Sequence, residues 1–565
     1  MSTQGMGEKK YGSAEEAFDE ALSRVPVGAF HLVLIAVCGW AIASDSVEIQ
    51  CISFVTPQLD SSNSNSNKTG RYVLRLDKSE EGVLDAIIFL GMMVGGYIWG
   101  SLSDLIGRRS CLITSLTFNG VFGLASAFSP TYGVFLLFRF LSGVGVGGSF
   151  PVVFSYYSEF FSRKSRGPFV IILAAFWILG SLFAALMAWI VIGQFHDSAH
   201  GSVGAMTMES WRIYVIICTF PCLSSALSLI FFPESPSFLF AKGELQSTAK
   251  VMHRIQLLHS YCGRAKEVTG REGWSQYLRD LQSQYGGRKE RRTGKWAWLT
   301  ELFQSTMAVF HRQHLRAMVV MLIVWFMFSF GYYGLLLWFP EYFKYIKDCN
   351  FERSHYCSIN PSHPHRSCSV SMETCNMTRG ERGDDIYLDS LYVALAAIPG
   401  TLISILTVNI VGAKAMLVFS LVVSGLSSLL IWVIPDQDKT EDVVVLLSSI
   451  FAGVSIIGWN SLDVISTSEL FPVHLRSTAF GIQSVLGRIG AITGNVTFGS
   501  LFSAGASPYL PILVVASALI LAGVSVIFLP SARGERSGLV HKFRCLCCFL
   551  CRRCLSRYNR GINYN

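Results

Sequence analysis

Two carboxylates lie inside an otherwise apolar run of the chain. Asp45 and Glu48 occur in FHLVLIAVCGWAIASDSVEIQCISFV, which is long enough to cross a bilayer as a helix. Residues three apart share one face of a helix, and a carboxylate at membrane depth costs at least about 2.5–3.5 kcal/mol. We therefore expect this face to meet a cavity and to handle a solute or a proton. A structural salt bridge with a basic helix is the alternative.

Three further charges fall within apolar runs, namely Arg139, Asp463 and Arg488. Arg139 begins RFLSGVGVGG, whose glycines allow close helix packing, and it is a candidate partner for a buried acid or a purely structural counter-ion. Trp459 and Asn460 share a helix face with Asp463, which predicts an amphipathic ligand wall. For an aromatic residue taken alone, ordinary core or interfacial packing is an equal alternative.

The composition places these charges in a membrane protein. The chain has 565 residues, of which 51% are hydrophobic and 15% are charged, whereas soluble domains carry about 25% charged residues. The net charge of +8 is the excess expected of cytoplasmic loops, so lipids rather than nucleic acids are the expected partners. No cleavable signal peptide is visible, and Ser13 and Glu16 suggest either a capped amphipathic helix or a disordered tail.

The apolar runs predict an all-α membrane protein with twelve transmembrane helices in two six-helix halves. A helix needs about 20 apolar residues to cross about 30 Å of hydrocarbon. The predicted spans are 29–54, 83–102, 110–129, 133–157, 168–193, 211–232, 317–340, 387–411, 414–434, 444–466, 477–503 and 508–530.

Loop charges predict the orientation. Residues 242–316 carry 14 Lys and Arg against 6 Asp and Glu, whereas residues 55–81 carry 4 of each kind. Positive loops stay in the cytoplasm, which places both termini there. The predicted segments are a cytoplasmic tail (1–28), the first half (29–232), a basic cytoplasmic central loop (233–316), the second half (317–530) with an outer Cys-rich loop (341–386), and a cytoplasmic Cys/Arg-rich tail (531–565).

Modification signals agree with this orientation. The outer loops contain glycosylation sequons at Asn67 and Asn376, and the second of these loops also holds four cysteines that could form two disulfides in any pairing. Clustered cysteines beside arginines in the last tail predict palmitoylation, with metal binding as the alternative. The disulfide candidates are Cys349, Cys357, Cys368 and Cys375, and the palmitoylation candidates are Cys545, Cys547, Cys548, Cys551 and Cys554.

A sequence repeat relates the two halves. SEFFSRKSRG and SELFPVHLRSTAFG each place an acid seven residues before an arginine, and GSLSDLIGRRS has a worn equivalent in NIVGAKAM, which keeps Gly412 and Lys414. Gly100 and Gly107 are expected to permit a tight turn. We expect these charges to latch the halves in one conformation. The expected network is Asp104, Arg108, Arg109, Glu159, Arg166, Glu469 and Arg476.

These stretches resemble a known family. GSLSDLIGRRS is similar to the signature of the major facilitator superfamily, and RFLSGVGVGGSFPVVFSYYSEF and PESPSFL resemble its sugar and organic-ion branch. Three further stretches resemble the synaptic vesicle glycoprotein 2 family: SDSVEI, SFGYYGLLLWFP and GVSIIGWNSLDVISTSELFP. That family has a longer N-terminus and a large luminal domain between helices 7 and 8, so its toxin reception and synaptotagmin binding are in question here.

The resemblance implies a central cavity, which in that family also binds racetam-type drugs. Arg488 stands where the family has a lysine, which keeps the charge and changes its hydrogen-bond geometry. The implied cavity residues are Asp45, Glu48, Trp177, Tyr332, Tyr333, Trp459, Asn460, Asp463 and Arg488.

Together these observations predict a secondary transporter that moves a small sugar-like solute or organic ion by alternating access. No nucleotide-binding GxxxxGK[ST] motif, catalytic triad or metal-spaced His/Cys set is apparent, so we expect neither an enzyme nor a cofactor. The alternative is a non-transporting regulator that recruits exocytic vesicle proteins, which the worn second loop would suit. A synaptic or secretory vesicle membrane is the implied location, with the plasma membrane as the alternative.

Overall fold

The structure is a computed structural model, and it is almost entirely helical. It describes residues 14–23, 25, 28–59, 76–162, 166–194, 201–203, 206–261, 270–285, 306–346, 383–433, 441–466, 470–471, 476–504 and 510–529. The first-half elements are α1 (Ala14–Ser23), α2 (Ala29–Leu59), α3 (Lys78–Ile106), α4 (Arg108–Ala127), α5 (Tyr132–Ser158), α6 (Arg166–Ala188), the π-helix η2 (Trp189–Gln194), β1 (Gly201–Val203), β2 (Met206–Met208) and α7 (Ser210–Leu229). After these come α8 (Pro236–Lys242), α9 (Leu245–Tyr261), α10 (Arg271–Tyr285), α12 (Arg312–Leu336), α14 (Gly383–Val411), α15 (Ala413–Val433), α16 (Glu441–Val464), α17 (Arg476–Ser503) and α18 (Leu510–Ile527).

Each of the twelve predicted spans coincides with a long helix, which confirms the fold class. Eleven helices in the described part of the chain are long and apolar enough to cross a membrane, and α17 is the remaining one, with Arg488 and Asn495 in its interior. The largest difference in length is at α3, which runs over Lys78–Ile106 instead of the predicted 83–102, and α2 continues to Leu59 instead of ending at residue 54.

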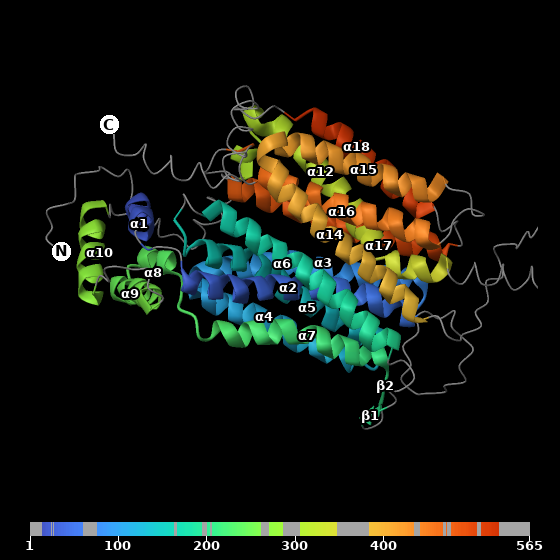
Figure 1. Ribbon diagram of the computed structural model, residues 1–565, viewed down its shortest axis with the longest axis horizontal. Coiled ribbons are helices and arrows are strands. Elements are labelled where there is room, and N and C mark those ends of the chain that lie inside the picture. The colour runs from blue at the N-terminus through green and yellow to red at the C-terminus, as the bar shows by residue number, and fades with distance from the viewer. Residues whose placement is uncertain are drawn as a thin grey trace, which may run out of the picture. The chain divides into compact units, whose positions relative to one another are not determined.

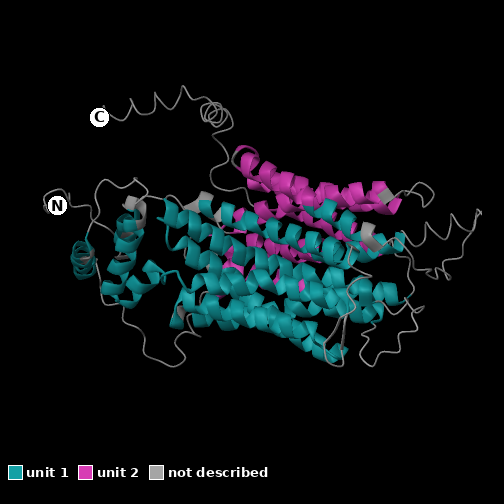
Figure 2. Cartoon of the chain, turned by 60° about the horizontal axis from the view of Figure 1, so that its bottom comes forward, with its two compact units in different colours: residues 1–297, 333–394, 491–508 teal, residues 298–332, 395–490, 509–565 magenta. Residues whose placement is uncertain are grey.

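The chain divides into two compact units (Figure 2). Unit 1 contains residues 1–297, 333–394 and 491–508, and unit 2 contains residues 298–332, 395–490 and 509–565. In unit 1, α2 packs against α6 and α7, α5 packs against α3 and α4, and α4 also packs against α7. In unit 2, α15 packs against α16 and α18. The grouping into two six-helix halves stays a prediction.

Four short helices form a cap at one end of unit 1, and the β1–β2 hairpin lies at the other end (Figure 1). We call them the cap end and the hairpin end. In the cap, α9 contacts α8 and α10, and α1 contacts α10. The Trp274 indole N–H donates to Gln256 Oε1 at 2.9 Å, which joins α10 to α9.

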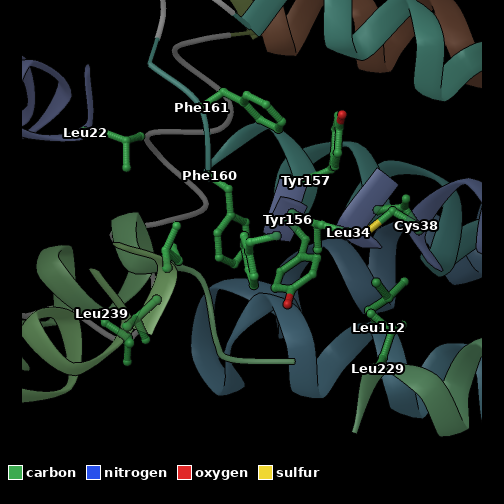
Figure 3. Close-up of a cluster of buried hydrophobic side chains, with 14 of the residues drawn as sticks. Leu22, Leu34, Cys38, Leu112, Tyr156, Tyr157, Phe160, Phe161, Leu229 and Leu239 are labelled. Carbon is green, nitrogen blue, oxygen red and sulfur yellow. The ribbon is translucent and has the colours of Figure 1, made fainter. Parts of the chain in front are cut away.

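The cap shares one hydrophobic core with the membrane helices beside it. Phe18 and Leu22 of α1 are buried in a cluster that includes Leu239 of α8, Trp274 of α10 and Leu34 of α2. Figure 3 shows part of this cluster. The core explains why α1 is ordered: its apolar side chains at 17, 18, 21 and 22 form one face of a helix.

The structure corrects three expectations. The central segment 233–316 is not simply a loop, because α8, α9 and α10 lie within it. The β1–β2 hairpin was not predicted, since strands of three residues leave almost no alternation to recognise. Gly100 lies inside α3, so the tight turn depends on Gly107, whose φ is +106°.

Replacement of Phe18 by Ala is expected to release α1 from the cap. The Phe18 ring stacks on Phe240 at 4.5 Å and is 4% exposed, and truncation of a buried Phe typically costs about 3–5 kcal/mol. Hydrogen–deuterium exchange should become faster in α1 and in α10. The control is Ser23→Ala, an exposed residue whose hydroxyl bonds to Glu20 O and to no other described residue. Unchanged exchange in Phe18→Ala would show that the cap does not hold α1.

Candidate functional site

The two acids of α2 are fully buried and face α5. Asp45 is 0% exposed and Glu48 is 2% exposed. Ser149 of α5 donates to Asp45, and Arg139 and Ser142 of α5 donate to Glu48. The prediction that both acids share one helix face is therefore confirmed.

Glu48 forms a buried ion pair with Arg139. Arg139 Nη1 lies 2.5 Å from Glu48 Oε1, and the guanidinium is 0% exposed. Ser142 Oγ is 2.5 Å from the same Glu48 oxygen and 2.8 Å from Asn119 Oδ1, so its single hydrogen serves one of the two acceptors at a time. Arg139 Nη2 also contacts Cys51 Sγ at 3.7 Å. This pair is the structural salt bridge that the sequence left open as an alternative for Glu48.

Asp45 is less fully satisfied than Glu48. Its Oδ1 accepts the Ser149 hydroxyl at 2.7 Å, while Oδ2 has no hydrogen-bond partner within the described residues. Asp45 and Glu48 also repel each other, because they are acids one helical turn apart on α2. Arg139 neutralises Glu48, which leaves Asp45 as the carboxylate of this group that has a free oxygen.

The other predicted cavity residues of unit 1 make aromatic and polar contacts. Trp177 meets Phe150 edge to face at 5.7 Å, and Tyr333 packs against Phe89 at 4.8 Å. A polar cluster that the sequence analysis did not identify lies beside α2, where Gln50 donates to Ser181 of α6 and Ser46 lies 3.0 Å from Ser181. Gln50 and Ser46 are four residues apart, which is a helix-face spacing.

In unit 2, Trp459 lies within an aromatic cluster. Its ring contacts Phe328 at 4.8 Å, stacked, and contacts Tyr332 and Trp325 at 5.6 Å, edge to face. Trp325 and Phe328 were not predicted, although positions 325, 328 and 332 repeat with helical spacing on α12. Asn460 and Asp463 follow on α16 and are partly buried. Arg488 lies on α17 in the same unit.

The predicted charge network at the cap end of unit 1 is formed in part. Arg108 Nε bonds to Glu159 Oε1 at 3.2 Å, and the other Glu159 oxygen accepts the Ser235 hydroxyl. Glu234, which the sequence analysis missed, accepts the Arg109 backbone N–H at 2.8 Å. The side chains of Asp104, Arg166, Glu469 and Arg476 lie outside the described residues.

Arg109 caps a helix instead of pairing with Glu159. Its guanidinium donates to the carbonyls of Leu229 at 3.0 Å and Ile230 at 2.5 Å, at the C-terminus of α7. Cations at a helix C-terminus satisfy free carbonyls and complement the helix dipole.

The second half repeats this arrangement. Gly412 has a φ of +94°, and Lys414, two residues later, donates to Leu529 O at 2.7 Å, at the C-terminus of α18. The predicted equivalence of the two loops therefore holds in three dimensions. Lys414 still caps a helix as Arg109 does. The divergence of NIVGAKAM from GSLSDLIGRRS is therefore weak support for a second half that has lost the ability to transport.

The sequence predicted sites of glycosylation, disulfide formation and palmitoylation. They lie outside the described residues, and their assignments stay predictions: Asn67, Asn376, Cys349, Cys357, Cys368, Cys375, Cys545, Cys547, Cys548, Cys551 and Cys554.

Comparisons with known proteins agree with the fold. The profile of the family described as "Sugar (and other) transporter" matches residues 32–344 and 382–540. Synaptic vesicle glycoprotein 2C of Mus musculus is 30% identical to this chain over 600 residues, which cover 90% of this chain and 79% of that protein. Synaptic vesicle glycoprotein 2A of Homo sapiens is also 30% identical, over 92% of this chain and 80% of that protein.

Solved structures support the same fold. The xylose transporter XylE from E. coli, in a partially occluded inward-open conformation, matches with a TM-score of 0.64 at 14% identity, over 90% of this chain and 100% of that chain. A crystal structure of a D-xylose-proton symporter matches with a TM-score of 0.60 at 17% identity, over 90% of this chain and 99% of that chain. At these identities the likeness concerns the fold. With the family profile and the relatives, it establishes that the chain belongs to the sugar (and other) transporter family of the major facilitator superfamily and is a multi-pass membrane transporter of a small solute.

Proposed function

We propose that this transporter moves a small organic cation and that Asp45 is the carboxylate the cation meets. The observation that carries the proposal is the charge balance of α2 and α5. Asp45 and Glu48 are two buried acids, and Arg139 neutralises one of them. A buried carboxylate with a free oxygen favours a positively charged partner, because an unpaired charge in an apolar medium is costly.

The aromatic cluster of unit 2 supports the same solute class. Three rings of α12 surround Trp459 of α16, namely those of Trp325, Phe328 and Tyr332. Trp and Tyr faces attract organic cations through their ring quadrupoles. Aromatic faces also stack on sugars, so the carboxylate is the feature that separates the two classes. In this proposal Trp177 and Tyr333 contribute to solute binding in unit 1, and Asn460, Asp463 and Arg488 contribute to it in unit 2.

Asp45 is closed to solvent in this structure, because its side chain is 0% exposed. A solute or proton therefore reaches it only after helices move, as alternating access requires. The network around Arg108 and Glu159 would then act as the latch of one conformation. We place the protein in a vesicle membrane with both termini cytoplasmic, on the charge asymmetry of its loops and on its vesicle relatives, where it could meet exocytic vesicle proteins.

Uptake into proteoliposomes tests the solute class. Purified protein should accumulate radiolabelled tetraethylammonium, and Asp45→Asn should reduce the initial rate by about 30-fold, since loss of one member of a buried charge pair costs about 2 kcal/mol or more. The control is Ser53→Ala on the same helix, whose hydroxyl donates to Gln50 O at 2.8 Å and, among the described residues, to no other group.

Three outcomes would contradict the proposal. Undiminished uptake by Asp45→Asn would remove Asp45 from the site. Uptake of labelled xylose driven by a pH gradient, with none of the cation, would make the solute a sugar and Asp45 a proton site. No uptake of any solute class by folded protein would favour the non-transporting regulator.

The ion pair itself is expected to stabilise the fold. Arg139→Met leaves Glu48 buried without its counter-charge, which typically costs about 3–5 kcal/mol. The midpoint of thermal unfolding in detergent should fall markedly. In the double variant Glu48→Gln/Arg139→Met, neither charge remains, so most of the loss should be recovered. If the double variant is as unstable as the sum of its single variants, the pair contributes no coupling energy.

A further inference from the structure

A second group of charges, most of them buried, lies at the hairpin end of unit 1, away from the cap. It consists of Lys78, Glu81 and Asp85 on α3 together with Glu341 and Lys344 on the segment that follows α12. We call these five residues the hairpin-end cluster. By sequence, α3 belongs to the first half of the chain and residues 341 and 344 belong to the second.

The cluster is held together by ion pairs. Lys78 bonds to Glu81 at 3.2 Å and also to Glu341. Lys344 lies 3.8 Å from Glu341 Oε1 and donates to the Pro57 carbonyl of α2 at 3.1 Å. The two lysines therefore join three segments of the chain around Glu341.

The same region contains a close backbone contact between α3 and α17. A Cβ added to Gly82 would lie 2.7 Å from Asn495 O, and a Cβ added to Gly499 would lie 2.6 Å from Lys78 O. One turn further along α17, Ser503 donates to Asp77 Oδ2 at 3.0 Å. At Gly82 and Gly499, therefore, α17 packs against α3 with the two backbones in close contact.

The acids of the cluster outnumber its bases by one. Asp85, Glu81 and Glu341 face two lysines, and the two unmatched oxygens are Asp85 Oδ1 and Glu341 Oε2. Asp85 is 3% exposed and Glu341 is 7% exposed. Both oxygens lack a hydrogen-bond partner in the part of the chain that the structure describes.

Within the described residues, no further positive charge acts on Asp85. Its electrostatic neighbours are Glu341 and, from α5, the Tyr132 phenol. On its own helix, Glu81 is one turn away. The α17 residues at this contact, Asn495 and Ser503, are uncharged. Asp389 of α14 is buried in the same unit and has interactions of its own.

We propose that Asp85 binds one proton when the second-half segments pack onto α3, so that sealing of the hairpin end takes up a proton. A proton from solvent bonds to a carboxylate oxygen of Asp85 and cancels the excess charge that the sealed cluster would bury. When the segments separate, water solvates the carboxylate and the proton leaves. A metal ion is less suited, because the described residues contain no group of three His, Cys, Asp or Glu side chains placed so that it could hold one. The site is independent of Asp45 and of the solute.

Asp77 provides an opposite pH dependence that the test must remove. Hydrogen bonds from Ser503 and Ser79 lower the pKa of Asp77. A carboxyl whose pKa is lowered in the sealed state favours sealing at higher pH, and this contribution is lost as the pH falls through that pKa. Proton uptake by Asp85 favours sealing at lower pH. The two groups therefore predict opposite slopes.

Crosslinking measures sealing without any transport assay. In full-length protein in nanodiscs, the double variant Asp77→Cys/Ser503→Cys reports the contact between α3 and α17 through a short bifunctional thiol reagent, with mass spectrometry of the linked peptides. It also removes Asp77. We expect the ratio of linked to unlinked protein to rise about tenfold from about pH 8 to about pH 5.5, as one pKa unit of difference between the two states would give.

Added charge variants identify the titrating group. Asp85→Asn in the double-cysteine background should give high crosslinking at both pH values, because the amide is uncharged. Glu341→Gln leaves two acids and two lysines in the cluster, so it should also abolish the pH dependence of crosslinking. This variant replaces Asp85→Asn in the test if Asp85→Asn fails to fold. Gly499→Val should abolish crosslinking at every pH, because its side chain would collide with the Lys78 carbonyl.

Several outcomes would overturn the proposal. A pH dependence that persists in folded Asp85→Asn would assign the proton to another group. Crosslinking that is independent of pH in the double-cysteine protein would show that sealing binds no proton. Crosslinking that follows Na⁺ concentration at fixed pH would make the bound cation a metal ion. Since uptake is not measured, failure here leaves the organic-cation proposal standing, and the reverse also holds.

Discussion

The buried ion pair between Glu48 and Arg139 is the interaction on which the arrangement of the first half depends. A carboxylate and a guanidinium are each expensive inside a membrane, and each becomes tolerable only at the position where it meets the other. The 2.5 Å contact thereby fixes α2 against α5. It also leaves Asp45, one turn away, as the acid that α5 supports with a single serine hydroxyl.

A second constraint comes from the helix ends. Arg109 and Lys414 each follow a glycine of positive φ by two residues, and each donates to the carbonyls that end the last helix of its half. Glycine is required because a Cβ disfavours this backbone conformation, and a cation is required because those carbonyls have no helical partner. The two loops therefore share the glycine turn and the capping cation, although NIVGAKAM has few residues in common with GSLSDLIGRRS.

The sequence predicts what depends on local periodicity and misses what depends on tertiary partners. The twelve spans follow from apolar length, and Asp45 with Glu48 share a face because helix geometry demands it. The choice of Arg139 as the partner of Glu48 joins positions 91 residues apart, which no spacing rule supplies. In α10, the spacing of Trp274, Leu278 and Leu281 is typical of one face of a helix and could have predicted it. The basic composition of residues 242–316 favoured a loop instead.

Asp45 and Asp85 follow one physical rule at two places along the membrane helices. In each case a nearby acid is matched by a base, Glu48 by Arg139 and Glu341 by Lys78, while the remaining acid keeps an oxygen without a hydrogen-bond partner in the described residues. A protein selected for stability alone would replace such an acid, since an uncompensated carboxylate lowers the stability of the folded state. In both of our proposals the remaining acid therefore meets a cation that binds and leaves: a solute at Asp45, and a proton at Asp85.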